Sequence, residues 1–157
     1  TRRRILGREA PELDGDRRRD FLREWGGIVE AAAEREEVRT ALSRARAGGV
    51  HPGAELIVER ELPFLLREED ALVEGIIDRL VLVRREGRVV AAEVVDYKTD
   101  RIAPGDDEAL RESVALYAPQ LRAYRRAVAH LYGIEPDAVR LRLVYLVPGV
   151  VRDVDGA

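Results

Sequence analysis

The segment that most constrains the fold is "LVEGIIDRLVLV" at residues 72–83, because apolar side chains occupy both of its faces. Successive side chains of a strand point to opposite faces, so a strand that is apolar on both faces belongs inside a covered sheet. Asp78 interrupts this apolar run with a carboxylate. The segment therefore predicts a central strand that has one acidic side chain.

Two further segments predict strands, one of them paired with this central strand. Residues 88–98, "RVVAAEVVDYK", follow after a short turn that contains Gly87, which indicates an antiparallel hairpin. Residues 55–67 alternate between apolar and polar side chains and contain Pro63. Proline lacks the backbone donor that an inner strand needs, so this segment is expected at an edge or with a bulge.

An apolar stripe at helical spacing predicts a helix before the first strand. The helix is expected from Asp16 to about Ala47, with a stop at residues 48–49 and a candidate kink at the glycine pair 26–27. Residues 1–15 are charged and contain proline and glycine, so they are expected to form a linker. Residues 16–157 are then expected to form a single domain.

A second helix and a last strand complete the pattern. The helix ends near Tyr132, and Pro119 is either its first residue or a kink in a longer helix that begins near Asp107. Residues 139–147 predict a strand, and the helical crossover before it favours a parallel neighbour. The expected order is αβββαβ, an α/β fold in which helices flank a mixed sheet.

Composition excludes several classes of protein. The 157 residues contain no cysteine, which excludes disulfides, zinc-thiolate sites and iron–sulfur clusters. No run approaches the roughly 20 apolar residues of a membrane span, and no signal peptide opens the chain, so we expect a cytoplasmic protein without a membrane partner. The absence of methionine indicates a piece of a longer protein. A net charge of −3 argues against binding nucleic acid by bulk charge alone.

The use of lysine is the most unusual feature of the composition. Lysine and arginine together number 27, and Lys98 is the one lysine among them. Side chains alternate along a strand, so Lys98 and Asp96 share a face with Val94. A charged group at the end of an apolar face costs several kcal/mol of stability unless it is paired with an opposite charge, hydrogen-bonded or bound to a metal.

The position of Asp78 relative to Asp96 depends on the hairpin turn. A two-residue turn at Glu86 and Gly87 puts the two aspartates on opposite faces of the sheet. A three-residue turn with Gly87 in the left-handed conformation puts both on one face. We predict the three-residue turn, unless a bulge elsewhere corrects the register.

Two carboxylates and an amine at one end of a sheet predict a site for a hard cation. Mg²⁺ prefers oxygen ligands and keeps several waters for a substrate phosphate. Lysine suits the third position because its compact ammonium can approach one water or one phosphate oxygen, whereas a guanidinium is bulky. The alternative is that Asp96 and Lys98 form only a partly exposed ion pair at a strand end.

A second unusual group follows on the predicted helix. The chain has no asparagine, and its one glutamine is Gln120, which lies at helical spacing from Tyr117 and Tyr124. One helix face would then present three hydrogen-bonding side chains. The alternative is that the tyrosines are ordinary core residues and Gln120 is solvated.

These motifs resemble those of a known family. "GIID" (75–78), "DYKTD" (96–100) and "YAPQLRAY" (117–124) are similar to the GxxD, DYK and Y-x-x-Q-x-x-x-Y motifs of the RecB/AddA-type nuclease domain, a branch of the PD-(D/E)XK superfamily. "RELPF" (60–64) resembles a segment on the first core strand of that family. The resemblance covers residues 55–147 and implies a restriction-endonuclease-like core.

The resemblance implies a role for each matching residue. Asp78 and Asp96 would bind a catalytic Mg²⁺, or Mn²⁺ in its place, and the backbone carbonyl of Tyr97 would complete the protein ligands. Lys98 would position and activate the attacking water and stabilise charge on the phosphate. The reaction would be hydrolysis of a phosphodiester bond in DNA.

The resemblance also implies contacts with DNA and with other parts of a larger enzyme. Gln120 and Tyr124 would support the site or contact the DNA strand. The family domain is the C-terminal part of an ATP-dependent helicase–nuclease, so the expected partners are DNA, an upstream helicase domain and a second subunit. The expected activity is that of an exonuclease in DNA end processing and recombinational repair. Backbone phosphates could be contacted by basic residues on or just before the second helix, which are Arg111, Arg122, Arg125 and Arg126.

One family feature is missing from the sequence. Related nuclease domains often have a metal-ligand histidine on an earlier helix, and the histidines here are His51, in a loop, and His130, late on the second helix. We interpret His51 as an exposed turn residue and His130 as a helix-packing residue. The missing histidine favours an alternative function, that of a catalytically inactive nuclease-fold module for DNA binding or subunit docking.

Overall fold

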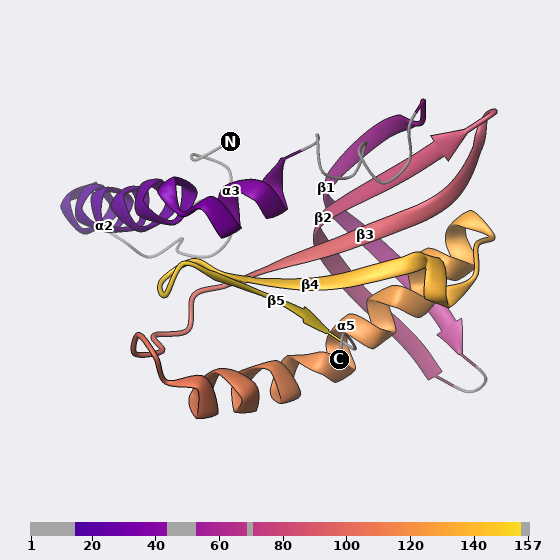
Figure 1. Cartoon of the computed structure of the whole chain (residues 1–157). Helices are drawn as coiled ribbons and strands as arrows, with labels where there is room; N and C mark the ends of the chain where they lie inside the picture. Colours follow the sequence, from indigo (N-terminus) through magenta and orange to yellow (C-terminus); the bar gives the residue numbers. More distant parts are fainter. Residues whose placement is uncertain (1–14, 44–52, 69–70, 155–157) are drawn as a thin grey trace.

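A five-stranded mixed sheet organises the computed structural model, which describes residues 15–43, 53–68 and 71–154 (Figure 1). The strand order is β1-β2-β3-β4-β5, with β3 and β4 parallel and the other neighbours antiparallel. The elements, in chain order, are α2 (Gly15–Glu34), α3 (Glu36–Leu42), β1 (Glu55–Glu68), β2 (Ala71–Arg85), β3 (Arg88–Lys98), α5 (Asp107–Tyr132), the 3-10 helix η1 (Pro136–Ala138), β4 (Val139–Tyr145) and β5 (Val150–Val154).

The expected order and pairing of the strands are confirmed. The strand with Pro63 is the edge strand β1, the doubly apolar strand is β2 between β1 and β3, and β4 is parallel to β3. Strand β5 was not predicted. The chain turns after Tyr145, where the N–H of Gly149 donates to the Tyr145 carbonyl over 3.0 Å, and β5 returns antiparallel to β4.

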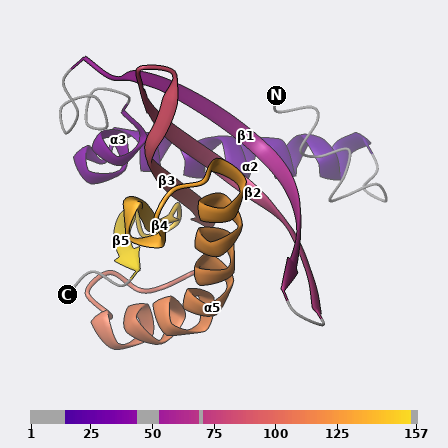
Figure 2. The same cartoon turned by 90° about the vertical axis from the view of Figure 1, so that its right-hand side faces the viewer.

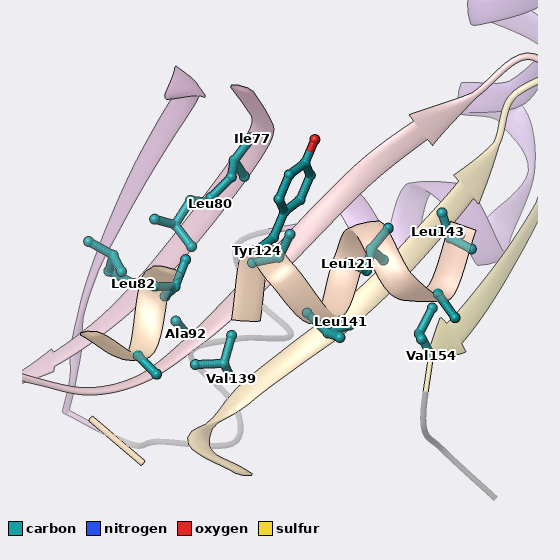
Figure 3. Packing of buried hydrophobic residues seen from close by; sticks show 14 of the residues in the cluster. Ile77, Leu80, Leu82, Ala92, Leu121, Tyr124, Val139, Leu141, Leu143 and Val154 are labelled. Carbon is teal, nitrogen blue, oxygen red and sulfur yellow. The ribbon is translucent and has the colours of Figure 1, made fainter. Parts of the chain in front are cut away.

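Helices lie on both faces of the sheet: α5 packs on one face, and α2 and α3 pack on the other at β3 and β4, while Leu72 and Ile76 of β2 stay exposed (Figure 2). Val94 of β3 belongs to the larger core under α5, whereas its neighbour Val95 packs with Ala32 and Val38 of α2 and α3. The alternation of side chains along β3 produces this division. In Figure 3, Leu121 and Tyr124 of α5 are seen among apolar side chains from the strands.

The first helix differs from the expected one. Helix α2 continues through Gly26 and Gly27, and the break comes at Arg35, whose φ of −68° and ψ of 125° are extended. Residues 44–49, in which the end of the helix was expected, and the linker residues 1–14 lie outside the described residues.

The turn between β2 and β3 corrects our prediction of a three-residue loop. Arg85 pairs with Arg88, and the two residues between them, Glu86 and Gly87, have φ values of 50° and 80°, as a two-residue hairpin turn requires. The register then shifts between Val83 and Arg84. This bulge inserts one extra residue, so it brings the two aspartates back into one register although the turn is the short one.

Helix α5 is the longer of the two alternatives, with Pro119 inside it. Proline cannot donate to the preceding turn, and Figure 2 shows α5 bent along its length. Asp106 caps the first turn by accepting from the N–H of Ala109 over 3.0 Å, and Gly133 ends the helix in the left-handed conformation at φ 64°. None of the helices in the described ranges is long and apolar enough to cross a membrane.

Candidate functional site

Asp78 lies where the backbone pairing of β2 and β3 ends. The last paired residues are Arg79 and Val95, so the continued register sets Asp78 across from Asp96. The N–H of Tyr97 donates to Asp78 Oδ2 over 2.9 Å. The Asp78 carboxylate therefore accepts the N–H that a backbone carbonyl of β2 would accept if the β2–β3 pairing continued. This bond holds the Asp78 side chain between the two strands.

The backbone carbonyl of Tyr97 faces the same side as Asp78. The carbonyl of Lys98 accepts from the N–H of Leu146 over 2.8 Å and thus points toward β4. Successive carbonyls of a strand point in opposite directions, so the Tyr97 carbonyl points toward β2. The expected ligand oxygens of Asp78 and Tyr97 thus lie on one side of β3.

Asp96 and Lys98 form a close ion pair on the face of β3 that continues the core. The Lys98 ammonium lies 2.6 Å from Asp96 Oδ2, and the two side chains are 13% and 5% exposed for lysine and aspartate. Oδ2 has no hydrogen bond with correct angles among the described residues. The ammonium at 2.6 Å compensates the charge of Oδ2 as an ion pair, although the angles of this contact are not those of a directed hydrogen bond.

These oxygens fit a hard divalent cation. Carboxylate and carbonyl oxygens are the ligands that Mg²⁺ prefers, and the buried Asp96 Oδ2 is held by an ion pair with Lys98 rather than by a directed hydrogen bond. In the described part of the chain, no group of three or more histidine, cysteine, aspartate or glutamate side chains is arranged for a metal. The fit therefore depends on Asp78, Asp96 and one backbone carbonyl.

The ammonium of Lys98 is held by residues of α5 as well. It donates to Gln120 Oε1 over 3.3 Å and lies 3.9 Å from the centre of the Tyr117 ring. The amide nitrogen of Gln120 donates to the Tyr124 hydroxyl over 2.7 Å. Tyr117, Gln120 and Tyr124 thus lie on one face of α5, as their spacing predicted.

Tyr124 lies between Gln120 and the core. Its ring packs edge-on against Phe64 at 5.4 Å between centres. Burial raises the pKa of Tyr124, and the charges of Asp96 and Asp78 raise it further, while its hydrogen bond with Gln120 lowers it. The charges of both carboxylates thus raise the pKa of one buried hydroxyl, which agrees with their location on the same part of the sheet.

A hydrogen-bond network behind Tyr117 was missed by the sequence analysis. The Tyr117 hydroxyl donates to both oxygens of Asp100, over 3.3 and 3.2 Å, and Ser113 Oγ donates to Asp100 Oδ1 over 3.1 Å. The Tyr145 hydroxyl donates in turn to Ser113 Oγ over 3.0 Å. The position of Asp100 two residues after Lys98 was the available signal, but its partners lie far along the chain.

His130 is not part of this site. His130 is exposed in the last turn of α5, so its interpretation as a packing residue was wrong. That position faces solvent because the apolar stripe of α5 is formed by other residues. His51 lies outside the described residues.

The arginines of α5 differ in their surroundings. Arg125 Nε donates to the carbonyl of Val139 over 3.1 Å, which joins α5 to the start of β4 and gives this side chain a structural role. Arg111, Arg122 and Arg126 are exposed. Their contact with DNA phosphates stays a prediction.

Comparison with known proteins decides the family. The model of the PD-(D/E)XK nuclease superfamily matches residues 1–155. The chain belongs to this superfamily. The sheet order and the flanking helices agree with the restriction-endonuclease-like core that the motifs implied.

Two curated proteins are similar to this member of the superfamily. One is an ATP-dependent helicase/nuclease subunit from Desulforudis audaxviator (strain MP104C), 38% identical over 120 residues, which cover 68% of this chain. The other has the same name in Desulforamulus reducens and is 36% identical over 103 residues, or 57% of this chain. The matches span 9% and 7% of the length of these relatives.

Proposed function

We propose that the chain is the nuclease module of a helicase–nuclease and hydrolyses phosphodiester bonds in DNA with a divalent metal ion. The observation that supports this most is the convergence of Asp78, in the middle of β2, with Asp96 and Lys98 at the end of β3, where the ammonium lies 2.6 Å from a buried carboxylate oxygen. A purely structural ion pair does not need a second carboxylate at the same position of the sheet.

The carboxylates of Asp78 and Asp96 and the carbonyl of Tyr97 would hold Mg²⁺, or Mn²⁺ in its place. When bound, such an ion supplies positive charge that acidifies a water molecule and stabilises charge on the phosphate. The Tyr97 N–H holds Asp78 in place over 2.9 Å, so this ligand is ordered before any cation arrives. Preorganisation of this kind reduces the cost of assembling the site.

Lys98 would act on the water and on the phosphate. Its ammonium is 13% exposed, and Gln120, which it contacts, is exposed, so a phosphate can approach from the side of α5. An ammonium beside the reacting phosphate stabilises the charge that builds in the transition state. A proton donor on a side chain of this length can also orient the attacking water.

Gln120 and Tyr124 would support this geometry or contact the DNA strand. The Gln120 amide uses its oxygen for Lys98 and its nitrogen for Tyr124. An exposed amide between a cation and a hydroxyl can exchange one of these bonds for a phosphate oxygen.

The names of the relatives support the wider setting of the module. Both are helicase/nuclease subunits, so the proposed partners are DNA, a helicase domain and a second subunit. The proposed setting is exonuclease action in DNA end processing and recombinational repair in the cytoplasm.

A second candidate function is that of an inactive nuclease-fold module for DNA binding or subunit docking. The observation that favours it is that Lys98 already compensates the charge of Asp96, while the described residues contain no group of three or more metal-ligating side chains. An inactive module would retain the ion pair for stability alone.

Cleavage of a labelled linear DNA separates the two candidates. The nuclease proposal expects cutting with Mg²⁺ or Mn²⁺, none with EDTA, and none by Asp96→Ala with either metal. DNA binding without cutting by the wild-type chain in both metals would favour the inactive module. Product lengths at short times would distinguish exonuclease from endonuclease action.

A further inference from the structure

We propose that Tyr117 is a positioning residue for Lys98 and that Asp100 fixes Tyr117 in place. The inference rests on the proposed nuclease function and adds a component to its site. The sequence motifs place Tyr117 near Gln120, but they do not say what the ring contacts or what holds it.

The contacts of the Lys98 ammonium support this role. An ammonium has three N–H donors, and the structure surrounds Nζ with three groups: Asp96 Oδ2 at 2.6 Å, Gln120 Oε1 at 3.3 Å and the Tyr117 ring at 3.9 Å. The first two are acceptors with oxygen lone pairs. The ring attracts the cation by its face and offers no such lone pair. It therefore holds the ammonium while the oxygen contacts can be exchanged for a phosphate oxygen.

The hydroxyl of Tyr117 explains why the ring stays in this place. It donates to Asp100 Oδ1 and Oδ2 over 3.3 and 3.2 Å, and Ser113 donates to the same carboxylate over 3.1 Å. Tyr145, on β4, donates to Ser113 over 3.0 Å. These bonds link the Tyr117 ring to Asp100, which follows β3, and through Ser113 to Tyr145 on β4. The position of the ring therefore does not depend on its own helix alone.

The bend of α5 makes such a tie necessary. Pro119 lies two residues after Tyr117 and removes a backbone bond of the helix at this level. A side chain at a weakened turn is less well fixed by its own helix. The bond to Asp100, two residues after the end of β3, restores a defined distance between Tyr117 and Lys98.

The single lysine of the chain provides a direct test. Isotope-labelled lysine gives one side-chain signal, which reports Lys98 alone. The ring should displace this signal upfield from its position in the unfolded chain. Tyr117→Leu should return the signal to the unfolded position, whereas Tyr117→Phe, which keeps the ring, should retain part of the displacement. Tyr132→Leu removes a ring of the same helix that lies elsewhere and should leave the signal unchanged.

Kinetics supply the second readout. Tyr117→Leu should lower kcat about tenfold with KM within about twofold, because the ring acts on Lys98 and not on the substrate. Tyr117→Phe and Asp100→Ala should each lie between wild type and Tyr117→Leu. A graded series of this kind is not expected from loss of folding, which circular dichroism of each variant checks.

Two results would overturn the inference. One is a lysine signal that Tyr117→Leu leaves in place, and the other is a moved signal with wild-type kcat. The spectrum does not depend on catalysis, so a wild-type chain that cuts no DNA would refute the proposed nuclease function while the signal still decides the position of Lys98.

Discussion

Asp96 and Lys98 depend on each other for charge compensation, because both side chains are largely removed from water. Removing the ammonium leaves a buried carboxylate without a partner. The stability lost in this way exceeds the net stability that the intact pair contributes. The same carboxylate is the proposed ligand of a divalent cation. Stability and metal binding are therefore coupled at this position.

Lys98→Ala should lower the free energy of unfolding by about 2–3 kcal/mol in EDTA. Addition of Mg²⁺ should recover part of this loss, since the cation binds the folded state and replaces the missing charge. Urea denaturation with and without Mg²⁺ measures both effects. Arg101→Ala, which breaks an ion pair of 80% and 59% exposed side chains with Glu24, should cost less than about 0.5 kcal/mol and show no Mg²⁺ dependence. Equal losses for the two variants would contradict the account.

Asp78 combines a structural bond with a proposed ligand, and two substitutions separate these roles. Asp78→Asn keeps an oxygen that can accept from the Tyr97 N–H, so its stability should stay within about 0.5 kcal/mol of wild type, while cleavage falls about a hundredfold or more. Asp78→Ala also removes the bond and should lose about 1–2 kcal/mol. Paired measurements of urea denaturation and DNA cleavage test this, and full activity of Asp78→Asn would exclude the residue as a ligand.

At the scale of single residues, the sequence singled out most of the residues that the structure brings together at the candidate site. A carboxylate inside an apolar strand and a lone lysine are local anomalies, so Asp78 and Lys98 stood out without a structure. Asp100 did not stand out. Its role comes from partners 13 and 17 residues away, and a bond of that range depends on how α5 lies against β3.

At the scale of elements, the contact between the β1–β2 hairpin and α5 sets the position of Tyr124. A Cβ atom at Gly75 would lie 2.8 Å from Phe64 and 3.0 Å from Tyr124. Both neighbours are aromatic rings that pack against each other, so they cannot move freely. The absence of a side chain at this position thus lets the helix approach the strand.

Gly75→Ala should lower the free energy of unfolding by about 1–3 kcal/mol through overpacking. It should also slow cleavage, because the displaced Tyr124 ring can no longer hold Gln120. Gly27→Ala is the matched control: no atom lies within 4 Å of its Cβ position in α2, so the change should stabilise the chain by about 0.5–1 kcal/mol. Thermal denaturation of both variants checks that Gly75→Ala loses stability and that Gly27→Ala gains it. A gain in stability for Gly75→Ala would refute the packing explanation.

The sequence predicted the strands and their pairing better than it predicted the local geometry of turns and helix breaks. The alternating and the continuous apolar patterns predicted β1, β2 and β3, because these patterns follow directly from which faces of a strand are buried. The two-residue turn was missed because Glu86 adopts a φ of 50°, which its residue type does not favour. The break at Arg35 has no glycine or proline, so packing of α3 rather than local preference must produce it.

At the scale of the whole molecule, all five tyrosines should titrate above their ordinary pKa of 10.0. Burial is the largest cause that raises the pKa of each of them: Tyr97, Tyr117, Tyr124, Tyr132 and Tyr145. A group whose pKa is raised on folding stabilises the folded state below its unfolded pKa. This contribution is lost as the pH rises through the folded pKa.

The free energy of unfolding should therefore lose these contributions only above pH 10. Tyrosinate absorbance of the folded chain should appear at higher pH than that of the chain in guanidinium chloride, which serves as the control. Coincident titration curves for the folded and unfolded chain would show that the tyrosines are not buried as described.

The claim on which the whole account depends is that Asp78, Asp96 and the Tyr97 carbonyl bind one divalent cation. Calorimetric titration of the 157-residue chain with Mn²⁺ tests it most directly. We expect one site in the wild type and in Asp137→Asn, which changes an exposed carboxylate on η1, and no site in Asp96→Asn. Unchanged Mn²⁺ binding by Asp96→Asn, or none by the wild type, would contradict the claim.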